Sequence, residues 1–166
     1  MLLRELSRAA VAFMVTVVAL PSPAANPSQT NAGDISHGRY LTIIGGCNDC
    51  HTEGYAESGG KVPQKDWLQG SVLGHRGPWG TTYAVNLRAK LATMSEAEWI
   101  TYAQTLKTRP PMPWFTLNQW SIDDLRALYR YVRDLGPAGA SAPAYLAPDK
   151  EPKLPYVDWK LPPPPK

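Results

Sequence analysis

Cys47-Asn48-Asp49-Cys50-His51 is the stretch that decides the fold of this 166-residue chain. Two thiols and an imidazole in the order C-x-x-C-H are typical of covalent haem attachment. The spacing has a chemical reason. Thioether bonds to two vinyl groups need thiols a short loop apart, and the histidine after the second thiol then reaches one face of the iron. The chain has two cysteines in all, so Cys47, Cys50 and His51 predict one covalently bound haem c.

Other interpretations of the two cysteines stay open. They can form a disulfide, half of a zinc site, or the reactive dithiol of a thioredoxin-like oxidoreductase. A zinc site needs a second ligand pair, and His37 and His75 do not provide one at finger-like spacing. A dithiol enzyme is expected within a strand-helix-strand pattern, which is not visible around position 47.

The first 24 residues have the pattern of a secretory signal peptide. Arg4 and Arg8 precede an apolar run from Ala9 to Leu20, and small residues suited to cleavage follow at Ser22-Pro23-Ala24. A run of about twelve residues is too short to span a bilayer. We therefore expect a periplasmic protein without a stable membrane span after cleavage, and an uncleaved anchor or a buried helix is the alternative.

The charge of the chain argues against nucleic acid as a partner. The formal net charge is +3, with 17 basic and 14 acidic residues. Removal of residues 1–24 takes away Arg4, Arg8 and Glu5, which leaves 15 basic and 13 acidic residues, or +2. The basic residues are scattered and form neither a phosphate-tracking stripe nor a polybasic membrane patch.

Three helices are expected around the cysteine motif. One runs over Asp34–Ile44 with Asp34 as its N-cap, and another follows the capping-box residue Ser95 to about Leu106. The clearest follows Ser121 and stops at Gly136. Its apolar stripe is Ile122, Leu125, Leu128, Tyr129, Val132 and Leu135. The Gly- and Pro-rich stretch from Thr52 to Leu91 shows little helical period and predicts loops.

The organisation that follows is a signal at residues 1–24, a folded domain at 33–137 and a Pro-rich, extended tail at 138–166. Such a tail cannot form a core of its own. It either packs on its own domain or stays free to meet a partner. The residues able to attach it to the domain are Tyr145, Leu146, Tyr156 and Trp159.

The second face of the iron decides the function, because a closed haem transfers electrons and an open one binds or activates small molecules. Met112 is the preferred second ligand. It lies in Arg109-Pro110-Pro111-Met112-Pro113-Trp114, where the prolines forbid helix and stiffen the backbone. The alternatives are Met94, which precedes a helix cap, and the two histidines at positions 37 and 75.

Donors for the haem propionates are expected in the loop between residues 79 and 88. Indole, hydroxyl, amide and guanidinium groups can supply them. The candidates are Trp79, Tyr83, Asn86 and Arg88, and ordinary loop packing is the other interpretation of each.

These features together resemble a class I c-type cytochrome. The segment from Gly80 to Leu87 and the Pro111-Met112-Pro113-Trp114 loop are similar to small bacterial mono-haem cytochromes c and to haem domains of periplasmic dehydrogenase cytochrome subunits. The resemblance covers roughly residues 33–137. It implies an all-α, cytochrome c-like fold of three to five helices around a covalently bound haem, with long loops and a Pro-rich tail.

The resemblance also implies particular roles for residues of this chain. The first and last helices should cross near Gly38 and the Tyr129/Tyr131 region, and His51 and Met112 should be the axial ligands. The carbonyl of Pro63 should accept the other ring N–H of the ligand histidine.

The function expected is that of a periplasmic electron carrier, with iron as the redox metal, rather than an enzyme. Its partners would be redox proteins such as a periplasmic dehydrogenase or a terminal oxidase. The alternative is a haem protein with an open sixth site, either peroxidase-like or gas-binding. An interaction module that uses the Pro-rich tail as its functional surface is a further alternative.

Overall fold

The structure, a computed structural model, describes residues 27–160, with side chains from Asp34 onward. The expected signal at 1–24 lies outside these residues, as does the end of the tail. Within the described range, none of the helices has the length and apolar character needed to cross a membrane.

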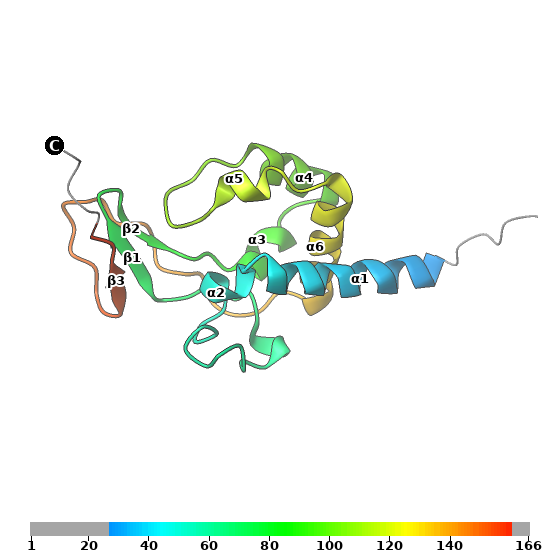
Figure 1. Cartoon of the computed structure of the whole chain (residues 1–166), viewed down its shortest axis with the longest axis horizontal. Coiled ribbons are helices and arrows are strands. Elements are labelled where there is room, and N and C mark those ends of the chain that lie inside the picture. The colour runs from blue at the N-terminus through cyan, green and yellow to red at the C-terminus, as the bar shows by residue number, and fades with distance from the viewer. Residues whose placement is uncertain (1–26, 161–166) are drawn as a thin grey trace, which may run out of the picture.

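Helices surround the centre of the molecule, and a small sheet lies at one end (Figure 1). The described residues form these elements in chain order: α1 Pro27–Ile44, α2 Cys47–His51, the 3-10 helix η1 Gln64–Asp66, β1 Gly74–Gly77, β2 Gly80–Tyr83, α3 Leu87–Ala92, α4 Glu96–Thr105, α5 Trp114–Leu117, α6 Ile122–Leu135 and β3 Tyr156–Asp158.

The expectation of an all-α fold is wrong, because a three-stranded mixed sheet accompanies the helices. β1 pairs antiparallel with β2, so that Gly74 lies opposite Tyr83, and pairs parallel with β3, so that Gly74 also lies opposite Tyr156. The hairpin turns at Pro78-Trp79 between two glycines, and Gly80 has a φ of +94° that glycine tolerates. The third strand comes from the tail, too far along the chain for local patterns to reveal the pairing.

Two of the three expected helices are confirmed. Ser95 caps α4, where its hydroxyl and the Glu98 carboxylate form a complete capping box, and Ser121 caps α6. Helix α1 is longer than expected, so Asp34 lies inside it instead of capping it, and its carboxylate pairs with Arg130 of α6. The apolar face of α6 also differs, since Ile122 is exposed.

Helices α1 and α6 cross where Gly38 meets α6. A Cβ atom at Gly38 would lie 2.1 Å from the Ala127 carbonyl oxygen and 2.6 Å from the Tyr131 Cβ. Only a residue without a side chain lets the two backbones approach this closely. The crossing expected near Gly38 and Tyr131 is therefore confirmed, and Tyr131, which the stripe omitted, is fully buried there.

The core lies against α6. The loop after α2 and the helices α3, α4 and α5 also contribute residues to it. Arg130 also joins three helices on the surface, because it pairs with Asp34 of α1 and with Glu96 of α4. The buried core cluster consists of Trp67, Leu68, Leu91, Trp99, Ala103, Leu117, Leu125, Leu128, Tyr131 and Val132.

The described part of the tail packs along the sheet rather than projecting away from it. It leaves the end of α6, passes the centre of the molecule and reaches β1 and β2 (Figure 1). Of the two arrangements considered for the tail, residues 138–160 adopt the packed one. The four residues expected to attach the tail all contact the hairpin of β1 and β2, two through side-chain hydrogen bonds and two through backbone pairing. They are Tyr145 and Trp159, and Leu146 and Tyr156, respectively.

Substitution of Gly38 by alanine tests the crossing. The new methyl group would overlap the Ala127 carbonyl, so we expect the free energy of unfolding to fall by about 2–3 kcal/mol, at the upper end of the cost of overpacking. Urea unfolding followed by circular dichroism measures this. Ile44→Ala, at an exposed position of the same helix, is the control and should change the free energy by less than about 0.5 kcal/mol. Equal effects of the two substitutions would contradict the close crossing.

Candidate functional site

The two cysteines and the histidine of the C-x-x-C-H motif lie on one helical turn, α2. Gly46, with a φ of +66°, turns the chain out of α1 and directly into α2. Cys47 and Cys50 are three residues apart on this turn and His51 is four residues after Cys47, so the three side chains share one side of α2. Both cysteines are free thiols and half-buried.

Burial keeps the two thiols protonated. It raises the pKa of Cys47 to about 11, and burial, together with the neighbouring charge of Asp49, raises the pKa of Cys50 as well. A redox-active dithiol needs a cysteine whose pKa is lowered, because the thiolate is the nucleophile. The surroundings of Cys47 therefore raise the pKa of its thiol, whereas a thioredoxin-like site lowers the pKa of its reactive cysteine.

His51 is held in one orientation and one tautomer. Its Nδ1 lies 2.7 Å from the carbonyl oxygen of Val85. A carbonyl oxygen can only accept, so Nδ1 must carry the proton and Nε2 keeps its lone pair. Burial lowers the pKa of His51 and favours the neutral ring, although the bond to Val85 acts in the other direction. Within the part of the chain that the structure describes, Nε2 has no hydrogen-bond partner.

A second layer of hydrogen bonds fixes α2 against the following loop. The His51 carbonyl accepts from the Gly70 amide at 2.8 Å. The Thr52 hydroxyl donates to the Asn48 side-chain oxygen at 2.7 Å and accepts from the Leu68 amide at 2.8 Å. Leu68 has a φ of +61°, a conformation that costs energy in a residue other than glycine and is often found at functional sites. No motif or spacing in the chain predicts these hydrogen bonds.

Pro63 does not have the role that the family resemblance implied. Its carbonyl accepts from the amide of Asp66, the last residue of η1, at 2.9 Å, while the Val85 carbonyl is bonded to His51. The acceptor thus comes from the segment between the hairpin and α3. A backbone carbonyl has no side-chain signature, so sequence patterns could not identify it.

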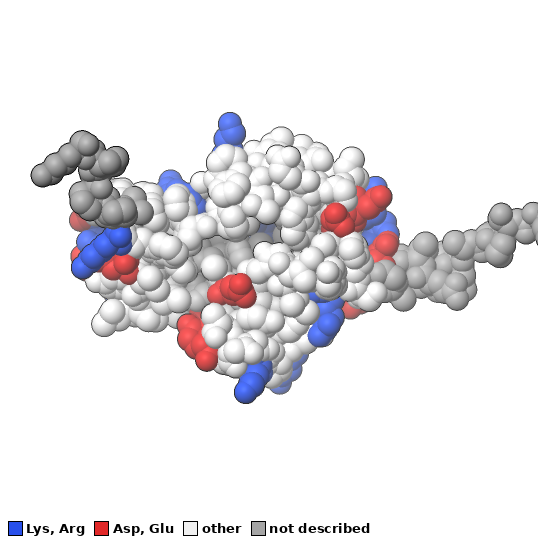
Figure 2. Space-filling model, in the orientation of Figure 1, with Lys and Arg blue, Asp and Glu red and all other residues white. Residues whose placement is uncertain are grey.

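Met112 lies in a loop of residues 107–113, called the Met112 loop from here on, which joins α4 to α5. Its side chain is half-buried and packs against the edge of the core, as does that of Cys47. No hydrogen bond or ring contact joins Met112 to His51 within residues 34–160. The surface is hollowed at the centre of one face, between the lobe of α4 and α5 and the lobe of α2, and mostly uncharged residues surround this hollow (Figure 2).

Of the alternative iron ligands, the two histidines have side-chain partners elsewhere. His37 pairs with Asp124 of α6 across 2.7 Å. His75 lies on β1 and accepts from the Trp159 indole at 3.3 Å. Met94 precedes α4, and its carbonyl accepts from the Tyr129 hydroxyl.

The expected propionate donors differ in what they contact. Asn86 caps α3 with its side-chain oxygen, and its amide nitrogen donates to the carbonyls of Ala138 and Ala140. The Trp79 indole donates a long hydrogen bond of 3.4 Å to the His75 carbonyl. Tyr83 is half-buried and lines a groove of about 400 Å³ between the sheet and the tail.

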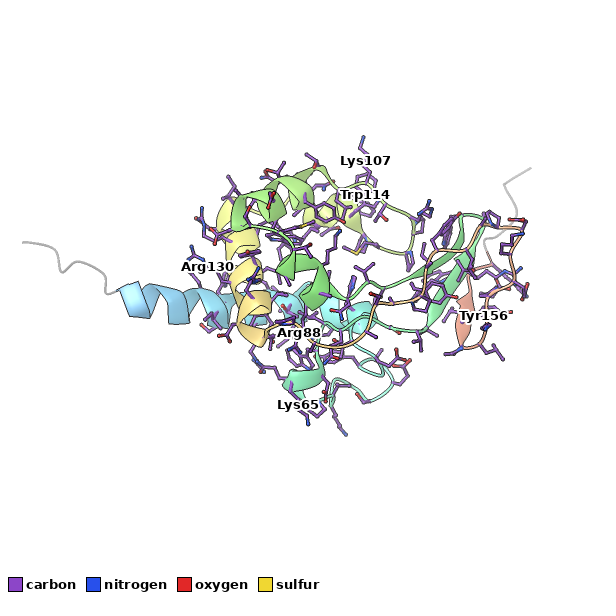
Figure 3. The ribbon with its side chains drawn as sticks, turned by 180° about the vertical axis from the view of Figure 1, so that it is seen from behind. Lys65, Arg88, Lys107, Trp114, Arg130 and Tyr156 are labelled. Carbon is purple, nitrogen blue, oxygen red and sulfur yellow. The ribbon has the colours of Figure 1, made fainter. Side chains whose placement is uncertain are left out.

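Arg88 has a structural role that the sequence did not indicate. It is buried, and its guanidinium donates to the carbonyl of Lys65 at 2.7 Å and to the carbonyls of Leu135 and Gly136 at the end of α6. Figure 3 shows Arg88 between the end of α6 and the η1 segment that carries Lys65. Its donors cap a helix and join it to η1, and a contact of Arg88 with a propionate stays a prediction.

No family model matches this chain, and neither a curated protein nor a solved structure matches it significantly. Among the residues the structure describes, no three His, Cys, Asp or Glu side chains are grouped in a way that could hold a metal ion.

Replacement of Arg88 tests whether it caps α6. Arg88→Met keeps the aliphatic stem and leaves three carbonyls without their donor, so we expect the free energy of unfolding to fall by about 2–4 kcal/mol. Urea titration measures the change. Arg39→Met is the control, because Arg39 is exposed and makes a hydrogen bond to the Gln64 side chain and a cation–π contact with the Trp67 ring, rather than bonds to the end of α6. A loss for Arg88→Met no larger than that for Arg39→Met would show that these bonds do not hold α6.

Proposed function

We propose that this protein is a one-electron carrier in which Cys47 and Cys50 hold one haem c and His51 is an iron ligand. The observation that carries the proposal is the state of His51. Its Nδ1 is bonded to the Val85 carbonyl, which leaves Nε2 with a lone pair on the same helical turn as two free thiols.

The residues present fit a covalently attached haem. Formation of a thioether adds a thiol across a vinyl group, with sulfur bonded to one carbon and hydrogen to the other, so no oxidant is needed. Both thiols are protonated and partly exposed, and they are free of a disulfide. When bound, the haem would carry one electron by cycling between Fe(III) and Fe(II). The Val85 carbonyl would orient the imidazole and raise its basicity, as the partners of metal-binding histidines commonly do.

Met112 is the second ligand in this proposal. A thioether is a soft, weak ligand that stabilises the reduced iron, and it needs a loop that presents it in one position. The Met112 loop meets that need in two ways. Prolines restrict its backbone, and its Pro110 carbonyl accepts from the Thr82 hydroxyl of β2 at 2.7 Å. With both axial positions taken, the site would pass electrons without binding a substrate.

The location and partners of the protein belong to the same proposal. The pattern of residues 1–24 supports export to the periplasm. A dehydrogenase or a terminal oxidase in that compartment is the class of partner we propose, in line with the resemblance to class I c-type cytochromes.

The experiment compares purified wild-type protein with Met112→Ala. We expect wild-type colour that survives acid-acetone extraction and a near-infrared sulfur-to-iron band in the oxidised form. Met112→Ala should lose that band, bind carbon monoxide rapidly when reduced, and have a reduction potential lower by on the order of 100 mV, since axial ligands set the potential. Met94→Ala is the matched control and should behave like wild type.

Two results would contradict the proposal in different ways. A colourless protein from cells competent in cytochrome maturation would exclude the haem. A coloured wild-type protein that already binds carbon monoxide rapidly at neutral pH would show an open sixth site and support the peroxidase-like or gas-binding alternative.

A further inference from the structure

The tail is fixed to the hairpin close to the Met112 loop. Residues 138–160 are called the strap from here on. The amide and carbonyl of Leu146 in the strap bond those of Thr81 in β2, at 3.0 and 2.8 Å. β3 adds a parallel pairing with β1, and the Arg76 carbonyl accepts from the Trp159 amide at 2.8 Å. The strap is thus held at both ends of the hairpin.

The closest approach of the strap is at the hairpin turn. A Cβ atom at Gly80 would lie 2.3 Å from the Leu146 carbonyl oxygen and 2.9 Å from the Tyr145 ring. The Tyr145 hydroxyl donates to the carbonyl of Trp79, in the turn itself, at 3.0 Å. Backbone and side chain therefore place the Tyr145 ring in one position beside the turn.

In that position Tyr145 reaches the Met112 loop. The guanidinium carbon of Arg109 lies 3.6 Å from the centre of the Tyr145 ring, the shortest of the cation–π contacts in the described residues. A guanidinium over a tyrosine face is attracted by the quadrupole of the ring. Arg109 is three residues before Met112, so this contact acts on the same short loop.

The Met112 loop depends on such contacts because it has no regular secondary structure of its own. Two contacts reach it from the sheet end of the molecule: the Thr82 hydroxyl at Pro110, and the Tyr145 ring at Arg109. Figure 3 shows the loop that begins near Lys107 and ends at Trp114 extending toward the sheet that carries Tyr156. The strap and the hairpin together therefore hold the far end of this loop.

We propose that the strap positions Met112, with Tyr145 as the positioning residue that acts through Arg109. This inference rests on the proposed function, because it assigns to the tail the task of keeping a weak thioether ligand at the iron. The Pro-rich tail is then part of the electron-transfer site and not a separate docking arm.

The test uses Tyr145→Leu in the full-length haem-bearing protein. Loss of the ring should raise the population in which Met112 is detached by about two- to five-fold, the factor that corresponds to an exposed cation–π contact. We expect carbon monoxide to bind the reduced protein faster by that factor, with covalent haem retained. Tyr145→Phe keeps the ring over Arg109 and loses only the bond to Trp79, so it should bind carbon monoxide nearly as slowly as wild type.

A second measurement does not depend on the haem. The Trp114 amide donates to the Met112 carbonyl at 2.9 Å, so its hydrogen exchange reports opening of the Met112 loop. Exchange at Trp114 should be about two- to five-fold faster in Tyr145→Leu. Tyr102→Leu is the matched control, because Tyr102 makes a cation–π contact with Lys90 on α3, away from the strap, and should leave exchange at Trp114 unchanged.

The outcomes separate this inference from the proposed function. Faster exchange at Trp114 in Tyr145→Leu supports the positioning role even if the protein proves to lack haem or Met112 proves not to be a ligand. Unchanged exchange and unchanged carbon monoxide binding would overturn it. It would also be overturned if Tyr102→Leu, or Tyr145→Phe, opened the loop as much as Tyr145→Leu does.

Discussion

The hydrogen bond from His51 Nδ1 to the Val85 carbonyl is the constraint on which the candidate site depends. It joins α2 to the segment that follows the hairpin, and it fixes which ring nitrogen can bind a metal. The loop of residues 67–70 supports the same helical turn through Thr52 and the His51 carbonyl. In the proposed function, this firmly held imidazole supplies the iron ligand, and the two free thiols beside it supply the attachment points of the haem.

The scaffold around this turn combines two kinds of packing. The contact of Gly38 with α6 sets the distance between the first and last helices, and the core fills the space beside them. At the other end the sheet is made of a glycine-rich hairpin and a strand from the tail. The tail therefore completes the fold beyond α6, and it contacts both the hairpin and the Met112 loop.

Some of these features could be predicted from local signals in the sequence. Ser95 with Glu98, and Ser121, predict the starts of α4 and α6 because caps act within one helical turn. The sheet could not be predicted in the same way, since β3 pairs with residues about eighty positions earlier and each strand has only three or four residues. The candidate site also has one part that could be predicted from the sequence and one part that could not. The C-x-x-C-H motif is visible in the sequence, whereas the Val85 carbonyl is a backbone atom without any signature.

Nitrogen NMR of reduced, histidine-labelled protein shows which nitrogen of His51 carries the proton and which one binds iron. We expect His51 to carry a proton on Nδ1 that exchanges slowly with water, and Nε2 to be unprotonated and bonded to iron. A proton on Nε2, or an Nδ1 proton that exchanges as fast as that of an exposed imidazole, would contradict it.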